Sequence, residues 1–194
     1  FSNATQELKE KFRAYTDYYL ALMESYGKAP MLWGALTHAD GTTPVRQKNV
    51  IMGLWSTDFA DPHEMKRQGW KMVSLSDWWT YIVPLADYYH DYLPLDYLYK
   101  DWTPRVFRNT EFEENDPSVL GFMFALWNDV YGCGITVHDM HERIFPPLQI
   151  LACKSWTAAL TTLPYDQFNQ KKGLLSEAPG VNEMGRIKAP MSLN

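Results

Sequence analysis

The 194-residue chain has few cysteines, no excess of positive charge and no long hydrophobic run. Its two cysteines form no CxxC pair, which argues against a zinc knuckle or a redox pair, and we expect Cys133 and Cys153 to be buried free thiols. With 18 Lys and Arg residues against 23 Asp and Glu residues, the net charge is −5, which leaves no electrostatic footprint for nucleic acid. The apolar runs are far shorter than the roughly 20 residues of a transmembrane helix, so no membrane span is predicted.

Phosphate-binding motifs are missing as well. Neither GxGxxG nor GxxxxGKS/T occurs, so no nucleotide site is predicted. His138, His141 and Glu142 have a spacing that a metal ion could use, but nothing in the sequence supplies further ligands. We therefore predict neither a metal nor a cofactor.

Aromatic residues are abundant instead, with 8 Trp, 12 Tyr and 9 Phe. Rings in this number favour a fold that stacks on the flat apolar faces of ligands, and sugars have such faces. The hydrophobic fraction of 46% is ordinary for a globular protein, and a chain of this length can bury one sizeable core.

Hydrophobic spacing predicts several helices. In the first, over residues 8–26, apolar residues recur at steps of three and four on one face: Leu8, Phe12, Tyr15, Tyr19, Leu22 and Tyr26. A short helix should open at Asp61-Pro62 and run to Gly69, because Asp is a favoured N-cap and Pro suits the first helical position. A closing helix is expected over residues 139–160, with these apolar side chains facing inward: Ile144, Leu148, Leu151 and Trp156.

Four nearly continuous apolar runs predict buried strands at residues 30–36, 49–55, 70–76 and 119–127. Strands that alternate with helices indicate an α/β fold with a parallel sheet and helical crossovers. Three of these strands carry a tryptophan near the carboxyl end, Trp33, Trp55 and Trp127, and in a parallel barrel active sites are built on that face. We expect the strands at 31–36 and 119–127 to be the two edges of the sheet.

Four segments in this order resemble the second half of a family 20 glycoside hydrolase, the family of the β-N-acetylhexosaminidases and lacto-N-biosidases. The segments are Pro30-Met31-Leu32-Trp33-Gly34, Gly53-Leu54-Trp55, Tyr81-Ile82-Val83-Pro84 and Phe124-Ala125-Leu126-Trp127-Asn128-Asp129. The resemblance implies an α/β fold that is the C-terminal half of a TIM (β/α)8 barrel. This half would contain about four parallel strands with helices, plus a Tyr-rich insert after the third strand.

The chain divides accordingly into three parts. Residues 1–5 look like a remnant of a cloning vector, and we exclude them from the fold. By resemblance, residues 6–163 would form the second half of a glycoside hydrolase (β/α)8 catalytic domain. Residues 164–194 would form a C-terminal strap or tail. The sequence itself gives no compartment, although the resemblance implies a secreted or cell-surface parent protein.

The resemblance also implies a chemistry. Family 20 enzymes use substrate-assisted catalysis, in which the 2-acetamido oxygen of the sugar attacks the anomeric carbon. Tyr81 would donate its hydroxyl to that oxygen, and the tryptophans named above would form an apolar cage around the acetamido group. Asp129 would accept hydrogen bonds from sugar hydroxyls. Three further residues would support these groups from behind: His38, Asp58 and Asn128.

Two departures from the family pattern are visible in the residues. Exo-acting relatives often carry Tyr-x-Asp where this chain has Val83, and Trp-Asn-Asp at 127–129 resembles the lacto-N-biosidase branch. More importantly, the general acid of the family lies in an Asp-Glu pair, and no Asp-Glu dipeptide occurs in these 194 residues. The chain is therefore predicted to be inactive alone. It would be either a cloned or proteolytic fragment, or a half barrel that needs the missing N-terminal half or a second copy. Its expected ligands are glycans that contain N-acetylhexosamine.

Two other functions stay open from the sequence. A non-catalytic carbohydrate-binding module would also be rich in aromatics and lack the acids, and a degenerate barrel could serve as a scaffold. Binding modules are mostly antiparallel sandwiches with alternating strands, whereas the strands here do not alternate. The tyrosines of the insert are interpreted as packing residues rather than an extended sugar subsite: Tyr88, Tyr89, Tyr92, Tyr97 and Tyr99.

Overall fold

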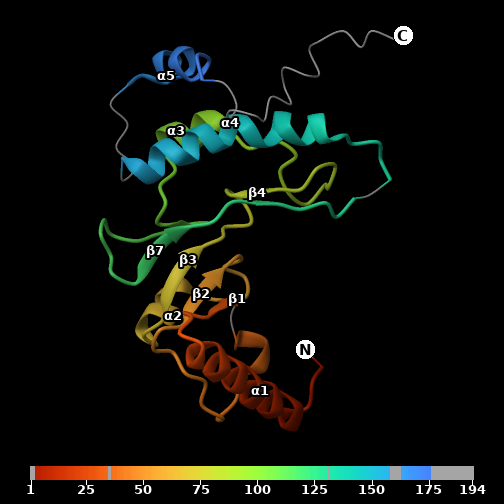
Figure 1. Cartoon of the computed structure of the whole chain (residues 1–194), viewed down its shortest axis with the longest axis vertical. Helices are drawn as coiled ribbons and strands as arrows, with labels where there is room; N and C mark the ends of the chain where they lie inside the picture. The colour runs from red at the N-terminus through yellow and green to blue at the C-terminus, as the bar shows by residue number, and fades with distance from the viewer. Residues whose placement is uncertain (1–2, 35, 131, 158–162, 176–194) are drawn as a thin grey trace. The chain divides into compact units, whose positions relative to one another are not determined.

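The computed structural model describes residues 3–34, 36–130, 132–157 and 163–175 (Figure 1). They belong to two compact units. Unit 1 comprises Phe1–Asp77 with Arg105–Phe124, and unit 2 comprises Trp78–Pro104 with Ala125–Asn194. Each unit is described by itself below. None of the helices in the described part of the chain is long and apolar enough to cross a membrane.

Unit 1 is built on a four-stranded sheet in the order β1-β2-β3-β7, in which every pair is parallel. The strands are β1 (Met31–Trp33), β2 (Ile51–Leu54), β3 (Lys71–Ser74) and β7 (Val119–Phe122). The helices and the hairpin of this unit are α1 (Gln6–Ser25), η1 (Leu36–Ala39), α2 (Pro62–Arg67), β5 (Val106–Phe107) and β6 (Thr110–Glu111). The predicted parallel sheet is confirmed, and β1 and β7 are its edges as expected.

The predicted strand at 119–127 is interrupted, which corrects the sequence analysis. Only β7 joins the four-stranded sheet, while β8 (Ala125–Leu126) pairs with β4 (Tyr81–Ile82) in unit 2. The register between β3 and β7 shifts at Met72/Val73, and Gly121 has a φ of +141°. That backbone conformation suits glycine and accompanies a bulge within β7, whereas the strand itself ends at Phe122. One apolar run therefore supplies strands to two sheets.

Helix α1 turns a different face to unit 1 than the one predicted. Its buried residues are Thr16 and Leu20. Most of the predicted apolar stripe is exposed instead: Leu8, Tyr15, Tyr19, Leu22 and Tyr26. Polar contacts from another face hold the helix, since Arg46 pairs with Asp17 and Glu24, each at 2.9 Å. These bonds, rather than the aromatic stripe, decide how α1 lies.

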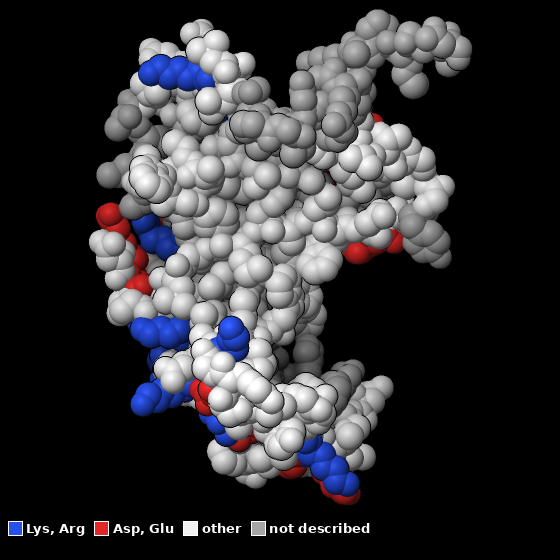
Figure 2. Space-filling view, in the orientation of Figure 1, with Lys and Arg blue, Asp and Glu red and all other residues white. Residues whose placement is uncertain are grey.

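The N-termini of α1 and α2 are set by local capping residues. Asp61 caps α2 by accepting from the His63 amide at 2.9 Å, and Pro62 is the first helical residue, as predicted. Thr5 caps α1 in the same way, so this residue contributes to the folded structure although it was assigned to the cloning remnant. Over α1 the charges of opposite sign lie beside one another on the surface (Figure 2), and the structure pairs Lys11 with Glu7 there.

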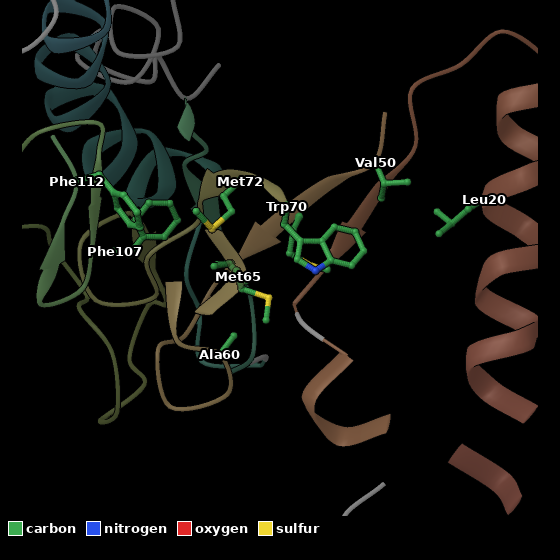
Figure 3. Packing of buried hydrophobic residues seen from close by; sticks show 10 residues of the cluster. Leu20, Val50, Ala60, Met65, Trp70, Met72, Phe107 and Phe112 are labelled. Carbon is green, nitrogen blue, oxygen red and sulfur yellow. The ribbon is translucent and has the colours of Figure 1, made fainter. Parts of the chain in front are cut away.

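The core of unit 1 lies between the sheet, α1 and α2. Figure 3 shows Leu20 of α1 directed toward Val50, with Trp70 beside them. Met72 of β3 lies fully buried on the same cluster. Phe107 of the hairpin also belongs to it. Burial of side chains of this size contributes about 1.5–3 kcal/mol each, which makes this cluster the main source of stability in the unit.

Asp116 fastens the loop before β7 to α2. Its carboxylate accepts from Lys66 Nζ at 2.6 Å, from the Ser118 hydroxyl at 2.6 Å and from the Ser118 amide at 2.9 Å. These bonds, led by the one from Lys66, lower the pKa of Asp116 to about 2. Because the aspartate is buried, the bonds stabilise the folded state only while the carboxylate is charged.

Asp116→Asn should lower the free energy of unfolding by about 1.5–3 kcal/mol at pH 7, the usual range for hydrogen bonds of a charged group. A folded-state pKa below the unfolded value means that this stabilisation is complete above about pH 4 and is lost as the pH falls toward 2. Urea unfolding followed by circular dichroism from pH 7 to pH 2 measures both effects. The matched control is Glu114→Gln, an exposed carboxylate of the same loop, and a difference for Asp116→Asn that does not change with pH would contradict the assignment.

Unit 2 combines the two-stranded sheet with three helices, α3 (Leu95–Lys100), α4 (Val137–Trp156) and α5 (Tyr165–Lys172). Helix α3 packs against both α4 and α5. Helix α5 lies in the part of the chain that was predicted to be an irregular tail. Residues 176–194 of that tail lie outside the described residues.

Helix α4 begins at a capping box in which Thr136 and Asp139 bond each other reciprocally. The predicted inward face is right for Leu151 and wrong for Leu148 and Trp156, which are exposed, Trp156 to 93%. The reason is that α4 buries two cations, Arg143 and Lys154, with neighbouring groups in unit 2. Cationic side chains can be buried only with such partners, and the apolar pattern does not reveal them.

The cysteine prediction is only half right. Both thiols are free, but Cys133 is exposed and Cys153 is half-buried. The Cys133 thiol donates to the Val130 carbonyl at 3.3 Å. The exposure follows from the position of Cys133 in a glycine-containing loop ahead of α4 instead of in the core.

Candidate functional site

Tyr81 and Trp127 meet at the ends of two paired strands. In β4 and β8, Tyr81 is the register partner of Ala125 and Ile82 of Leu126. The Trp127 amide donates to the Ile82 carbonyl at 2.9 Å, which continues the ladder by one residue. Side chains two residues apart on a strand share a face, so the Trp127 ring comes to lie beside Tyr81. Their ring centroids are 5.6 Å apart at an interplanar angle of 64°.

The two rings differ in exposure. Tyr81 is 4% exposed, whereas Trp127 is 38% exposed and can offer its ring to a ligand. Tyr81 is also covered by Tyr89, whose ring centroid lies 6.0 Å away in an edge-to-face arrangement. Aromatic contacts of this geometry hold rings in one orientation. Tyr81 is therefore a firmly placed hydroxyl donor at a strand end.

Asp129 lies two residues beyond Trp127 and is held by a tyrosine. The Tyr88 hydroxyl donates to Asp129 Oδ2 at 3.1 Å. This bond to a carboxylate favours the neutral phenol and raises the pKa of Tyr88 above its ordinary value. Tyr88 in turn packs edge-to-face on Tyr89, with ring centroids 5.2 Å apart. Rings and carboxylate thus form one continuous cluster in unit 2.

Tyr88 and Tyr89 belong to a loop, residues 83–92, which we call the tyrosine loop. The loop closes on itself where the Val83 amide donates to the His90 carbonyl at 2.9 Å. Arg143 of α4 holds the C-terminal end of the tyrosine loop. Its Nε donates to Asp91 Oδ1 at 2.8 Å, and its Nη2 donates to Asp91 Oδ2 at 3.1 Å. Arg143 also donates to the Asp139 carbonyl and stacks over Tyr92, 4.5 Å from the ring centroid.

The other two predicted cage residues lie in unit 1, at the carboxyl ends of β1 and β2. Gly34 follows Trp33 with a φ of +86°, and its amide donates to the Gly53 carbonyl at 2.7 Å. A Cβ at position 34 would lie 3.3 Å from Trp55 Nε1, so glycine leaves the space that the indole occupies. Trp55 also packs on Phe59, whereas Trp33 is 48% exposed.

Of the three residues predicted to support the site, Asp58 and His38 belong to unit 1 and Asn128 belongs to unit 2. Asp58 follows β2 and forms an ion pair with Arg108 at 2.9 Å on the surface of unit 1. Asn128 is exposed between Trp127 and Asp129. The backbone of His38 lies in η1, and its side chain lies outside the described part of the structure.

No group of three or more His, Cys, Asp or Glu side chains that could hold a metal ion occurs among the described residues. At the start of α4, where the sequence has His138, His141 and Glu142, His138 Nε2 lies 3.3 Å from Glu142 Oε1. Glu113 and Glu114, the only adjacent acids in the chain, are exposed.

The structure therefore brings together Tyr81, Trp127 and Asp129 in unit 2. Sequence analysis missed the residues that hold them, Tyr88 and the Arg143–Asp91 pair. The run of tyrosines in the loop was a visible signal, but it was interpreted as packing. Nothing local in the sequence connects Tyr88 to Asp129, 41 residues away, or Arg143 to Asp91, 52 residues away.

Comparisons with known proteins show similarity of fold to three solved structures. No family model and no curated protein matches the sequence. Two solved structures of the pneumococcal exo-β-D-N-acetylglucosaminidase StrH are similar, one of them described with its tandem GH20 catalytic modules. Each is 18% identical, with TM-scores of 0.60 and 0.61, and the matches cover 89% and 88% of this chain. A β-N-acetylhexosaminidase from Bacteroides fragilis is 20% identical over 84% of this chain, with a TM-score of 0.57.

The likeness covers only part of each neighbour. This chain spans 43% and 42% of the two StrH chains and 33% of the Bacteroides chain. At such identities the comparison shows the fold alone. The chain has a mixed α/β fold with a parallel sheet and helices, similar to part of these glycoside hydrolases.

Proposed function

We propose that this chain is the C-terminal half of the catalytic barrel of a family 20 glycoside hydrolase. The parent protein would cleave terminal β-linked N-acetylhexosamine, or a disaccharide that contains it, with retention of configuration through an oxazolinium intermediate. The observation that carries the proposal is the cluster of Tyr81, the first residue of β4, with Trp127 and Asp129, which follow the carboxyl end of the parallel strand β8. The fold similarity to three hexosaminidase structures supports it.

In this proposal Tyr81 donates its hydroxyl to the acetamido oxygen and holds it in the orientation for attack on the anomeric carbon. The sugar's own acetamido oxygen attacks the anomeric carbon, so the protein needs no carboxylate nucleophile. A phenol that is buried and held between two rings loses little freedom when it donates to that oxygen. Its hydrogen bond is stronger than in water because the surroundings have a low dielectric constant.

The remaining site residues bind the sugar. The half-exposed Trp127 ring provides an apolar wall, and Asp129 accepts bonds from sugar hydroxyls. Trp33 and Trp55 stay proposed sugar-binding residues on the resemblance alone, at the strand ends of unit 1. Asp58 is proposed as a support rather than a contact, because Arg108 already engages it.

The general acid is proposed to come from outside this chain, because no Asp-Glu pair occurs in it. Its source would be the N-terminal half of the barrel or a second copy of the chain. In the described residues β1 and β7 are the edges of the four-stranded sheet, which is where further strands would be added.

The test compares two aryl glycosides on the full-length protein that contains this chain. We expect hydrolysis of 4-nitrophenyl N-acetyl-β-D-glucosaminide, and at least about 10²-fold slower hydrolysis of the corresponding β-D-glucoside, which lacks the intramolecular nucleophile. Equal rates on the two substrates would rule out substrate assistance. Saturable binding of N-acetylglucosamine without hydrolysis would instead favour the carbohydrate-binding module or the degenerate scaffold.

A further inference from the structure

We propose that Tyr88 is a positioning residue of the sugar site: its hydroxyl orients the Asp129 carboxylate, and the Arg143–Asp91 pair holds the tyrosine loop in place for this task. The inference rests on the proposed function, because it assigns Asp129 to sugar binding. It adds to that function a set of positioning residues, which lie in the tyrosine loop and α4 and not in the strands.

The first support is that Tyr88 engages only one of the two oxygens of the Asp129 carboxylate. Tyr88 donates to Oδ2 of Asp129 at 3.1 Å, and among the described residues no other hydrogen bond to this carboxylate is present. Asp129 is exposed at the strand end, where an unheld side chain would sample several rotamers. With Oδ2 engaged, Oδ1 remains available for a sugar hydroxyl in one defined direction.

The second support is that the tyrosine loop is firmly held. A hydrogen bond between two exposed side chains is worth little when both must first be ordered. Here the loop closes through Val83 and His90, and Asp91 Oδ1 also accepts from the Leu85 amide at 3.3 Å. Arg143, buried to all but 7%, fixes Asp91 with two bonds of a planar fork. Little freedom is left for Tyr88 to lose when it engages Asp129.

The third support is the position of Tyr88 itself. Its ring is 57% exposed and stands beside the carboxylate, so the residue is not a packing residue of the core. Through Tyr89 the same loop also covers Tyr81. A displacement of the loop would thus change the hydroxyl-binding carboxylate first and the acetamido-binding tyrosine second.

The test is a double-mutant cycle on the full-length protein, with the N-acetylglucosaminide as substrate. Tyr88→Phe should raise KM about threefold to tenfold, as loss of one hydrogen bond implies, and leave kcat nearly unchanged. In the Asp129→Ala background the same substitution should have no further effect. The matched control is Tyr92→Phe, the same change in the same loop, which keeps the ring on Arg143. It should leave both constants unchanged.

A second readout does not depend on activity. In the chain labelled at tyrosine, the phenol of Tyr88 should titrate above an ordinary tyrosine, and Asp129→Ala should return its pKa toward the ordinary value. An unchanged titration would overturn the inference, because the bond would not exist in solution. Additive effects in the cycle would also overturn it. If the full-length protein is inactive, the proposed function fails, and the cycle is then judged on the Kd for N-acetylglucosamine.

Discussion

A pure preparation of this 194-residue chain is expected to hydrolyse aryl N-acetyl-β-glucosaminides far more slowly than the full-length protein. Departure of the leaving group needs a proton from a positioned acid, and the proposed acid is not among these residues. Loss of general acid catalysis alone costs about 10²–10⁴-fold in rate. Activity of the chain and of the full-length protein, measured side by side at equal molarity, gives the ratio.

The acid can be bypassed in a control experiment. Fluoride is a good leaving group that needs little protonation, so N-acetylglucosaminyl fluoride should narrow the gap between chain and full-length protein if the missing acid is its main cause. Ordinary turnover of the nitrophenyl substrate by the chain would contradict the proposal that the acid lies elsewhere. A gap of the same size with both substrates would locate the defect in sugar binding instead.

Tyr81→Phe in the full-length protein should lower kcat by about 10²-fold, because the acetamido oxygen loses the hydroxyl that orients it for attack on the anomeric carbon. KM should change little, since most of the sugar-binding contacts remain. The ring contacts with Trp127 and Tyr89 survive the change, so the fold is preserved. Steady-state kinetics on the N-acetylglucosaminide measure both constants.

Trp127→Ala is the contrasting variant for this experiment. It removes a wall of the sugar pocket and one of the rings that hold Tyr81, so it should raise KM and lower kcat together. A Tyr81→Phe variant with normal kcat would show that the tyrosine does not orient the acetamido oxygen. In that case the cluster would serve sugar binding alone.

Local patterns predicted those parts of the fold that depend on short-range physics. The start of α2 was predictable because an Asp–Pro pair caps a helix through bonds within one turn. The parallel sheet with β1 and β7 at its edges was predictable because non-alternating apolar runs separated by helices allow few arrangements. Tyr81, Trp127 and Asp129 could be named as candidates because the segments that carry them resemble those of family 20 glycoside hydrolases.

Tertiary structure alone decided which surfaces and partners these elements use. Helix α1 buries Leu20 and leaves most of its apolar stripe exposed, and its Asp17 and Glu24 form ion pairs with Arg46, which lies outside the helix. The apolar run at 119–127 is divided between two sheets at residues 123–124, and the hydrophobic pattern does not mark this break.

The residues that hold the site in place, Tyr88, Asp91 and Arg143, could not be predicted from the sequence, because their contacts also depend on the tertiary structure. Tyr88 meets Asp129 across 41 residues, and Arg143 meets Asp91 across 52. Such bonds form only after the β4–β8 pair, the tyrosine loop and α4 have come together, since a single polar contact cannot offset the entropy of closing so long a loop. The sequence by itself determined the candidate sugar-binding groups, and the folded chain determined which side chains hold them in place.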